Sequence, residues 1–181
     1  MLGLARVLDP EQRLHVVTPR APLELQGWGG FHWYVVPQVG YPDPATFKAS
    51  FEALAALHDE LWERTGIGPE RTVLGGFSMG AVMSYAMSLG PERPVPAGIM
   101  AFSGFIPTVE GWYPDIARRP ELKVFIAHGR RDPVISVDFA RRDRTLLEES
   151  QLEVDYHEGD GIHQIDPAHA NAAIAWLATV V

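Results

Sequence analysis

The pattern Gly-x-Ser-x-Gly at residues 76–80 constrains the fold most strongly, because of the segments on either side of it. The apolar run Thr72–Leu74 precedes the pattern, and the helix-like apolar segment Ala81–Leu89 follows it. A strand–turn–helix of this kind lifts the serine hydroxyl to the open end of a sheet, and glycines on both sides keep side chains out of the tight turn. We therefore predict that Ser78 is a nucleophile. The alternative is a glycine-rich turn in which Ser78 only caps the helix.

Apolar runs typical of strands alternate with helical patterns along the chain, which predicts βαβ units and a parallel sheet. Several runs are almost wholly apolar, as expected for strands that are covered on both faces. We expect one α/β domain over residues 1–181, doubly wound and mostly parallel, with about five strands, helices on both faces and no large lid. The predicted strands are Arg13–Thr18, Arg71–Phe77, Ala97–Phe102, Leu122–His128 and Gln151–His157.

The clearest predicted helix runs from Pro44 to about Thr65, because Asp43 suits an N-cap and Gly66 suits the position just after a helix end. Its apolar residues, with His58 among them, recur at spacings of three and four and predict one buried stripe. Further helices are predicted from Ser78 to Gly90, over Val137–Ser150 and from Pro167 to about Thr179.

Composition excludes several classes of function. The chain has no cysteine, which excludes disulfides, cysteine-ligated metals and thiol nucleophiles. The formal net charge of −8 is spread along the chain and argues against non-specific nucleic-acid binding. The first residues do not resemble a signal peptide and no apolar run approaches about 18 residues, so we expect a cytoplasmic protein without a membrane span. The histidines form no metal-spaced set, so neither a metal nor a cofactor is expected.

A serine hydroxyl needs a base within hydrogen-bond reach, and the base needs a group that orients it. Asp132 follows one predicted strand and His163 follows the next, so both lie at the sheet edge that carries Ser78. An Asp-Pro turn and a surface histidine are the alternatives for these two residues. The order serine, aspartate, histidine along the chain is nevertheless the order used by α/β-hydrolases. We therefore predict that the three side chains form a proton relay.

Five segments share their sequence with one family of enzymes. They are Val17–Pro22, Gly75–Ala81, Ala101–Gly104, His128–Val134 and Gly161–His163. On these segments the chain resembles the α/β-hydrolase carboxylesterases that are grouped with acyl-protein thioesterases and bacterial phospholipase/carboxylesterase proteins. The resemblance covers nearly the whole chain. It implies an α/β-hydrolase fold with Ser78 as nucleophile, His163 as general base and acid, and Asp132 as the orienting carboxylate.

The beginning of the chain departs from that family. Members normally start with further strands and a His-Gly-x-Gly-Gly-like loop, which donates one of the two N–H groups of the oxyanion hole. Here a helix expected at Leu2–Leu8 comes first, and the strand between those matching Arg13–Thr18 and Arg71–Phe77 is missing. We favour direct pairing of these two segments. The alternatives are a second chain that covers the open edge, as in a homodimer, or a sequence that is a fragment.

The resemblance leaves the backbone N–H of Met79 as one oxyanion donor. A second donor is expected from Gly29 or Gly30, because glycine permits close approach of the backbone, although a flexible surface turn is the alternative. Loss of one donor typically slows such enzymes about a hundred- to a thousandfold. Residues expected to line the substrate pocket, each with core packing as the alternative, are Trp28, Phe31, Trp33, Ile106, Trp112 and Val134.

These observations predict a serine carboxylesterase that hydrolyses short- to medium-chain esters, small molecules, through an acyl-enzyme. Activity should fall below about pH 6–7, because a histidine that accepts a proton must be neutral. The stretch 104–121 is too short for a large lipase lid, so we expect an open site. The alternatives are a thioesterase or lysophospholipase, and a hydrolase fold that mainly binds ligands because an oxyanion loop is missing.

Overall fold

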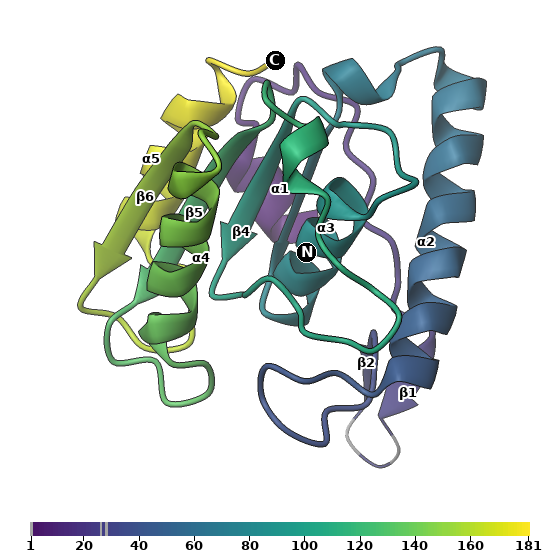
Figure 1. Cartoon of the computed structure of the whole chain (residues 1–181). Helices are drawn as coiled ribbons and strands as arrows, with labels where there is room; N and C mark the ends of the chain where they lie inside the picture. The colour runs from purple at the N-terminus through teal and green to yellow at the C-terminus, as the bar shows by residue number, and fades with distance from the viewer. Residues whose placement is uncertain (1, 26, 28) are drawn as a thin grey trace.

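The computed structural model describes residues 2–25, 27 and 29–181. Its centre is a sheet of four parallel strands in the order β3-β4-β5-β6, with helices on both faces (Figure 1). This arrangement confirms the predicted doubly wound α/β fold without a large lid. The strands are β3 (Val73–Phe77), β4 (Gly98–Phe102), β5 (Lys123–Gly129) and β6 (Val154–Gly159).

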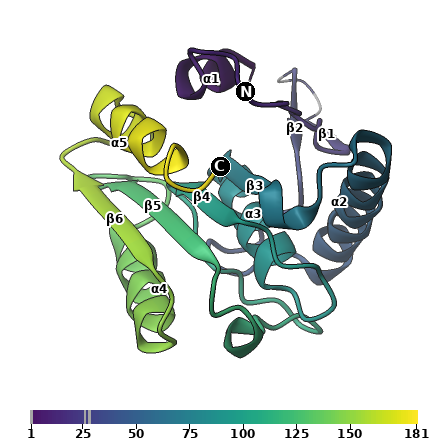
Figure 2. The same cartoon turned by 90° about the horizontal axis from the view of Figure 1, so that it is seen from above.

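The helices form two layers, and Figure 2 shows them from above. Helices α1 and α5 cover one face of the sheet, α3 and α4 cover the other, and α2 packs on α3 beside β3. A separate antiparallel hairpin, β1–β2, lies outside the main sheet. The bounds are α1 (Leu2–Leu8), α2 (Pro44–Thr65), α3 (Met79–Leu89), α4 (Val137–Glu149) and α5 (Pro167–Leu177), with 3-10 turns at Pro69–Arg71 and Ile116–Arg118, and hairpin strands at Leu23–Leu25 and Gly30–His32.

Successive side chains of β4 point to opposite faces of the sheet, so they pack in different clusters of the core. Ile99 and Ala101 pack in the cluster beneath α3 and α4, whereas Met100 and Phe102 pack in the cluster beneath α1 and α5. All five residues of β4 are buried, as expected for a central strand of a parallel sheet. This strand is therefore covered on both sides.

The ends of α2 follow local sequence signals, as predicted. The Asp43 carboxylate accepts the backbone N–H of Thr46 at 2.9 Å, and Pro44 occupies the first helical turn, where its missing N–H costs nothing. Gly66 ends the helix in the left-handed conformation with φ of 67°. These contacts fix the residues at which α2 begins and ends.

The prediction of a strand at Arg13–Thr18 is wrong, and so is its pairing with β3. The Asp9 carboxylate accepts the N–H groups of Arg13 and Leu14 at 3.0 and 2.8 Å, which holds the start of the segment in a local turn. Among the described residues, only β4 pairs with β3, so β3 is an edge strand and Gly75 at its middle is exposed. The main sheet has four strands for this reason. The space along the free edge opens into two cavities of about 480 and 770 Å³.

One buried carboxylate ties α4 to the loop after β4. Asp143 is only 1% exposed, and its carboxylate accepts the N–H of Ile106 at 2.7 Å. Burial raises the pKa of Asp143 to about 7, although the Ile106 N–H and the Arg142 guanidinium act in the opposite direction. Because the folded state favours the protonated form, the stabilisation from this group is complete below the ordinary value of 3.8 and is lost as the pH rises towards 7.

The variant Asp143→Asn should remove this pH dependence, because its amide oxygen still accepts the Ile106 N–H and carries no charge. Between pH 4 and pH 7 the free energy of unfolding of the wild type should fall relative to the variant, by up to about 1.4 kcal/mol per pH unit. Urea unfolding at several pH values measures the difference. The exposed Asp138 on the same helix provides the control variant Asp138→Asn. A constant difference between Asp143→Asn and the wild type across this range would contradict the assignment.

Among the described residues, no helix is both long and apolar enough to cross a membrane.

Candidate active site

Ser78 occupies a strained turn between β3 and α3. Its φ of 56° and ψ of −122° are rare for a residue with a side chain, and such strain is concentrated at functional sites. The Ser78 N–H donates to the Phe102 carbonyl at 2.9 Å, so the turn continues the β3–β4 ladder. The Ser78 side chain makes no cap hydrogen bond to α3, which is evidence against the alternative of a simple helix cap.

The two glycines of the pattern have different physical roles. A Cβ on Gly76 would lie 2.7 Å from the Ala81 nitrogen and closer still to the Gly80 carbonyl, and backbone atoms cannot move away. Gly76 is therefore required by the turn, as predicted. A Cβ on Gly80 would meet nothing within 4 Å, so the expected collision at this second glycine does not occur.

The matched pair Gly76→Ala and Gly80→Ala tests this difference. We expect Gly76→Ala to destabilise the fold by about 3 kcal/mol, because of the backbone overlap. Gly80→Ala should be neutral or stabilise by up to about 1 kcal/mol, because alanine is the better helix former. Thermal unfolding of both variants measures the contrast. Equal losses of stability would show that the close approach at Gly76 is incorrect.

Asp132 lies on the loop after β5 and is held by backbone donors. Its Oδ1 accepts the N–H groups of Val134 and Ile135 at 2.8 and 2.9 Å. The buried His128 lies beneath the loop, with Nε2 2.9 Å from the Ile135 carbonyl and 3.4 Å from Asp132 Oδ2. The Asp132 side chain is fully enclosed, so its orientation is set by these contacts.

His163 lies on the loop after β6, which is joined to the Asp132 loop by backbone hydrogen bonds. The N–H of Arg130 donates to the Gly159 carbonyl at 2.7 Å, and the N–H of Arg131 donates to the Gly161 carbonyl at 3.0 Å. The loops approach so closely that a Cβ on Gly129 would lie 2.5 Å from the Gly161 carbonyl oxygen. The imidazole of His163 also packs on Phe77, with ring centroids 4.7 Å apart.

The structure brings the three predicted side chains together although 85 and 31 residues separate them in sequence. His163 Nε2 lies 3.0 Å from Ser78 Oγ, and His163 Nδ1 lies 2.7 Å from Asp132 Oδ2. Since a carboxylate can only accept, Nδ1–H donates to Asp132, which leaves Nε2 to accept the Ser78 hydroxyl proton. The geometry can therefore move a proton away from Ser78.

The charge of Asp132 is maintained by its hydrogen bonds. Burial raises the pKa of the Asp132 carboxyl, but the N–H of Ile135, the His163 imidazole and the N–H of Val134 together outweigh burial and lower the pKa below its ordinary value. The carboxylate is thus ionised at neutral pH. An ionised Asp132 keeps the proton on Nδ1 of His163 and stabilises the imidazolium that forms when Nε2 is protonated.

The structure places the predicted oxyanion donors at different positions relative to Ser78. Met79 begins α3, so its N–H has no partner within the helix and lies beside Ser78. Gly29 has a φ of 62° and Gly30 begins β2, but neither lines the cavity that reaches Ser78. A second donor from either glycine stays a prediction.

A cavity of about 480 Å³ lies beside Ser78. Phe31 and Trp33, two of the residues predicted to line the substrate pocket, line this cavity. The Ser50 hydroxyl donates to the Trp33 carbonyl, which joins that segment to α2. Trp28 lies outside the described residues. Three predicted residues do not line this cavity: Ile106 and Trp112 pack in core clusters, and Val134 is 53% exposed on the Asp132 loop.

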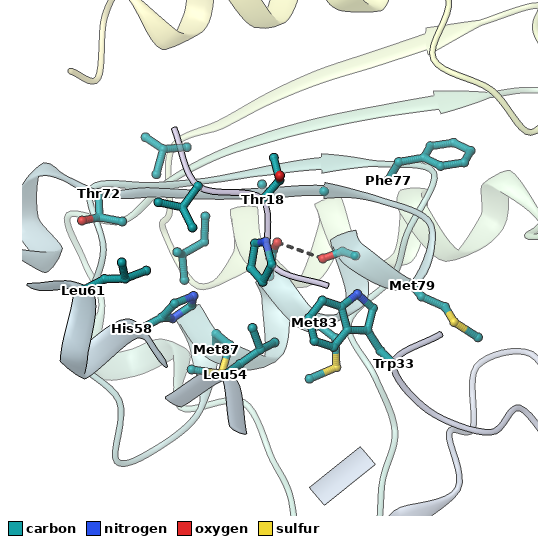
Figure 3. Close-up of a pocket in the computed structure, with 18 of the residues that line it drawn as sticks. Thr18, Trp33, Leu54, His58, Leu61, Thr72, Phe77, Met79, Met83 and Met87 are labelled. Carbon is teal, nitrogen blue, oxygen red and sulfur yellow. Dashed lines mark hydrogen bonds between the residues drawn. The ribbon is translucent and has the colours of Figure 1, made fainter. Parts of the chain in front are cut away.

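Sequence reasoning missed most of the cavity wall. Figure 3 shows its lining residues from α2, α3 and β3 around the space. The signal for Leu54, His58 and Leu61 is the apolar stripe of α2, but such a stripe equally indicates packing in the core. The missed residues are Leu54, His58, Leu61, Trp62, Met83 and Met87.

Comparison with known proteins extends these findings. The sequence model of the family described as Phospholipase/Carboxylesterase matches residues 5–181. Acyl-protein thioesterase 1 of Debaryomyces hansenii is 29% identical over 160 residues, which span 82% of this chain and 68% of that protein. Lysophospholipase-like protein 1 of Mus musculus is 22% identical over 178 residues, which span 93% and 74%. The carboxylesterase of Bacillus cereus has a TM-score of 0.82 at 21% identity, covering 99% of this chain and 81% of that chain.

The topology and the strained serine turn define the class of protein as an α/β-hydrolase fold, and the structural likeness to the Bacillus cereus carboxylesterase agrees with that class. The family match covers almost the entire sequence. The chain therefore belongs to the phospholipase/carboxylesterase family of serine hydrolases.

Proposed function

We propose that this protein is a serine carboxylesterase that hydrolyses short- to medium-chain esters through an acyl-enzyme. The observation that supports this most strongly is the unbroken hydrogen-bond chain from Ser78 Oγ through His163 to Asp132, at 3.0 and 2.7 Å. A family of hydrolases is the context in which such a chain activates a nucleophile.

In the first half-reaction Ser78 Oγ attacks the ester carbonyl carbon while His163 Nε2 takes the hydroxyl proton. The imidazolium then gives that proton to the leaving alkoxide as the carbon–oxygen bond breaks, so the alcohol departs neutral. Asp132 remains ionised throughout and stabilises the imidazolium. The acyl group is now bonded to Ser78.

In the second half-reaction water takes the place of the alcohol. His163 Nε2 accepts a proton from the water as its oxygen attacks the acyl carbon, and then returns the proton to Ser78 Oγ as the acid is released. We assign the Met79 N–H to the developing oxyanion, with Gly29 or Gly30 as the proposed second donor. A transition-state analogue bonded to Ser78, whose oxygen contacted only Met79, would exclude the glycines.

A thioesterase is the second candidate, favoured by the relatives named acyl-protein thioesterase 1. The same residues would act on a thioester, with a thiolate as the leaving group. Parallel assays with p-nitrophenyl acetate and an acetyl thioester of matched leaving-group acidity measure which kcat/KM is larger.

The hydrolase assay also tests the alternative of a ligand-binding protein with weak catalysis. We expect a burst of p-nitrophenol equal to the enzyme concentration, followed by steady turnover. The proposed function would be wrong if no burst occurred and p-nitrophenyl acetate were hydrolysed no faster than by free imidazole in solution.

A further inference from the structure

His128 is a buried titratable residue that the proposed mechanism does not use. It lies near the end of β5, four positions before Asp132, and its side chain is fully buried. Its Nε2 is 2.9 Å from the Ile135 carbonyl oxygen and 3.4 Å from Asp132 Oδ2. The same Oδ2 lies 2.7 Å from His163 Nδ1. The Asp132 carboxylate is therefore contacted by two imidazoles, of which only His163 reaches Ser78.

The contacts of His128 fix where its proton lies. A carbonyl oxygen only accepts, so Nε2 carries hydrogen and donates to Ile135. Burial lowers the pKa of His128, although the Ile135 carbonyl and the charge of Asp132 oppose the change. The imidazole is therefore neutral at neutral pH, and Nδ1 carries no hydrogen. Among the described residues Nδ1 has no hydrogen-bond partner, so the polar contacts of this ring are made through Nε2–H.

The Nε2–H group of His128 holds Asp132 in two ways. It donates to the carbonyl of Ile135, whose own N–H donates to Asp132 Oδ1 at 2.9 Å. Ile135 is buried, which limits the replacement of this donor by water. The positive end of the same N–H group also lies near Oδ2, at a distance that is longer than a normal hydrogen bond and makes the contact electrostatic. Both contacts favour an ionised carboxylate in the place where it meets His163.

We propose that His128 is a positioning residue of the catalytic relay and acts through Asp132. This proposal rests on the proposed function and adds a fourth side chain to it. His128 does not line the cavity that reaches Ser78, so its loss should lower kcat and leave KM unchanged. The alternative is a histidine that only fills space in the core. That role would need the volume of the side chain but no donor at Nε2.

Two substitutions separate the donor from the volume of the side chain. Glutamine, like histidine, carries a nitrogen three bonds from Cβ, so His128→Gln can keep the donor to Ile135. Methionine is also unbranched and similar in length but has no donor. We expect His128→Met to lower kcat for p-nitrophenyl acetate about ten- to a hundredfold with KM within twofold of wild type, because a small displacement of a relay group costs about this much. His128→Gln should keep kcat within about threefold.

His128→Asn gives a second comparison that does not depend on the folding of the methionine variant. Its amide nitrogen lies two bonds from Cβ, in the position of Nδ1, so it cannot replace the donor at Nε2. The kcat of His128→Asn should be at least tenfold below that of His128→Gln. Equal kcat values in these two amide variants would contradict the requirement for a donor to Ile135.

The control variant is Arg119→Met. Like His128, Arg119 is buried and donates to backbone carbonyls, in this case those of Gly90 and Arg93. Gly90 lies at the opposite end of α3 from Ser78. Urea unfolding should show that Arg119→Met loses stability, while its kcat stays within twofold of wild type. Equal losses of kcat in Arg119→Met and His128→Met would show that activity falls with stability alone, and would overturn the positioning role.

The Nδ1–H proton of His163 gives a readout without catalysis. A proton in a short hydrogen bond to a carboxylate resonates far downfield in a proton NMR spectrum, and its absence from His163→Gln assigns it. We expect this resonance to stay in place in His128→Gln and Arg119→Met, and to move upfield or disappear in His128→Met.

The two proposals can fail separately. An unchanged resonance with unchanged kcat in His128→Met, or equal losses in His128→Met and His128→Gln, would overturn the positioning role alone. Absence of p-nitrophenyl acetate turnover in wild type would instead overturn the proposed function. The His163 resonance would then still decide whether His128 positions Asp132.

Discussion

Replacement of Ser78 by alanine should lower kcat for p-nitrophenyl acetate by about 10⁴- to 10⁶-fold while the fold persists. The variant removes the only atom that bonds to the acyl group in the proposed mechanism. The fold should persist, because the Ser78 side chain makes no cap hydrogen bond to α3 that the substitution could remove. Steady-state turnover measures the loss of kcat, and circular dichroism of the same preparation measures whether the fold persists.

The control for this variant is Ser88→Ala on α3, the helix that follows Ser78. Ser88 is fully buried, and its hydroxyl finds no partner among the described residues. Removal of such a hydroxyl should leave activity unchanged and should not lower stability. If Ser78→Ala and Ser88→Ala retained equal activity, Ser78 would not be the nucleophile.

Asp132→Asn should lower kcat by about 10⁴-fold, and the geometry of the loop explains why. The N–H groups of Val134 and Ile135 both donate to Oδ1, so the amide oxygen of the variant must stay there. The amide nitrogen then takes the place of Oδ2, opposite His163 Nδ1. Two donors cannot face each other, so His163 would carry its proton on Nε2 and could no longer accept the Ser78 proton.

Asp160→Asn provides the matched control on the loop after β6. Asp160 is exposed and pairs with Arg130 at 2.7 Å, and a surface ion pair of this kind contributes about 0–1 kcal/mol. We expect turnover of this variant to stay within twofold of wild type. A loss of less than tenfold for Asp132→Asn, with the fold intact by circular dichroism, would contradict the orienting role of Asp132.

Local signals made much of the fold predictable from the sequence. Asp43 and Gly66 mark the ends of α2 through interactions with their own neighbours, so no distant residue has to be known. The alternation of strands and helices likewise predicts that residues after β3, β5 and β6 meet at one sheet edge. The approach of Ser78, Asp132 and His163 follows from that topology.

The features that were not predictable depend on distant parts of the chain. Arg13–Thr18 has a strand-like pattern, but a strand also needs a neighbour to pair with, and in the structure Asp9 captures the first two N–H groups. Leu54 and Leu61 belong to an apolar stripe that looks the same in a sequence whether it packs on a core or borders a cavity. The sequence alone also does not show that the space beside the Gly80 Cβ position is empty, because this depends on where the surrounding backbone lies.

The most direct test of the central proposal is covalent labelling with a p-nitrophenyl phosphonate ester, followed by mass spectrometry of the digested protein. We expect one phosphonyl group for each chain, bonded to Ser78, with labelling abolished in Ser78→Ala and strongly slowed in Asp132→Asn. Labelling at another residue, or no labelling above the rate of a denatured control, would contradict the assignment of Ser78, His163 and Asp132 as a catalytic relay.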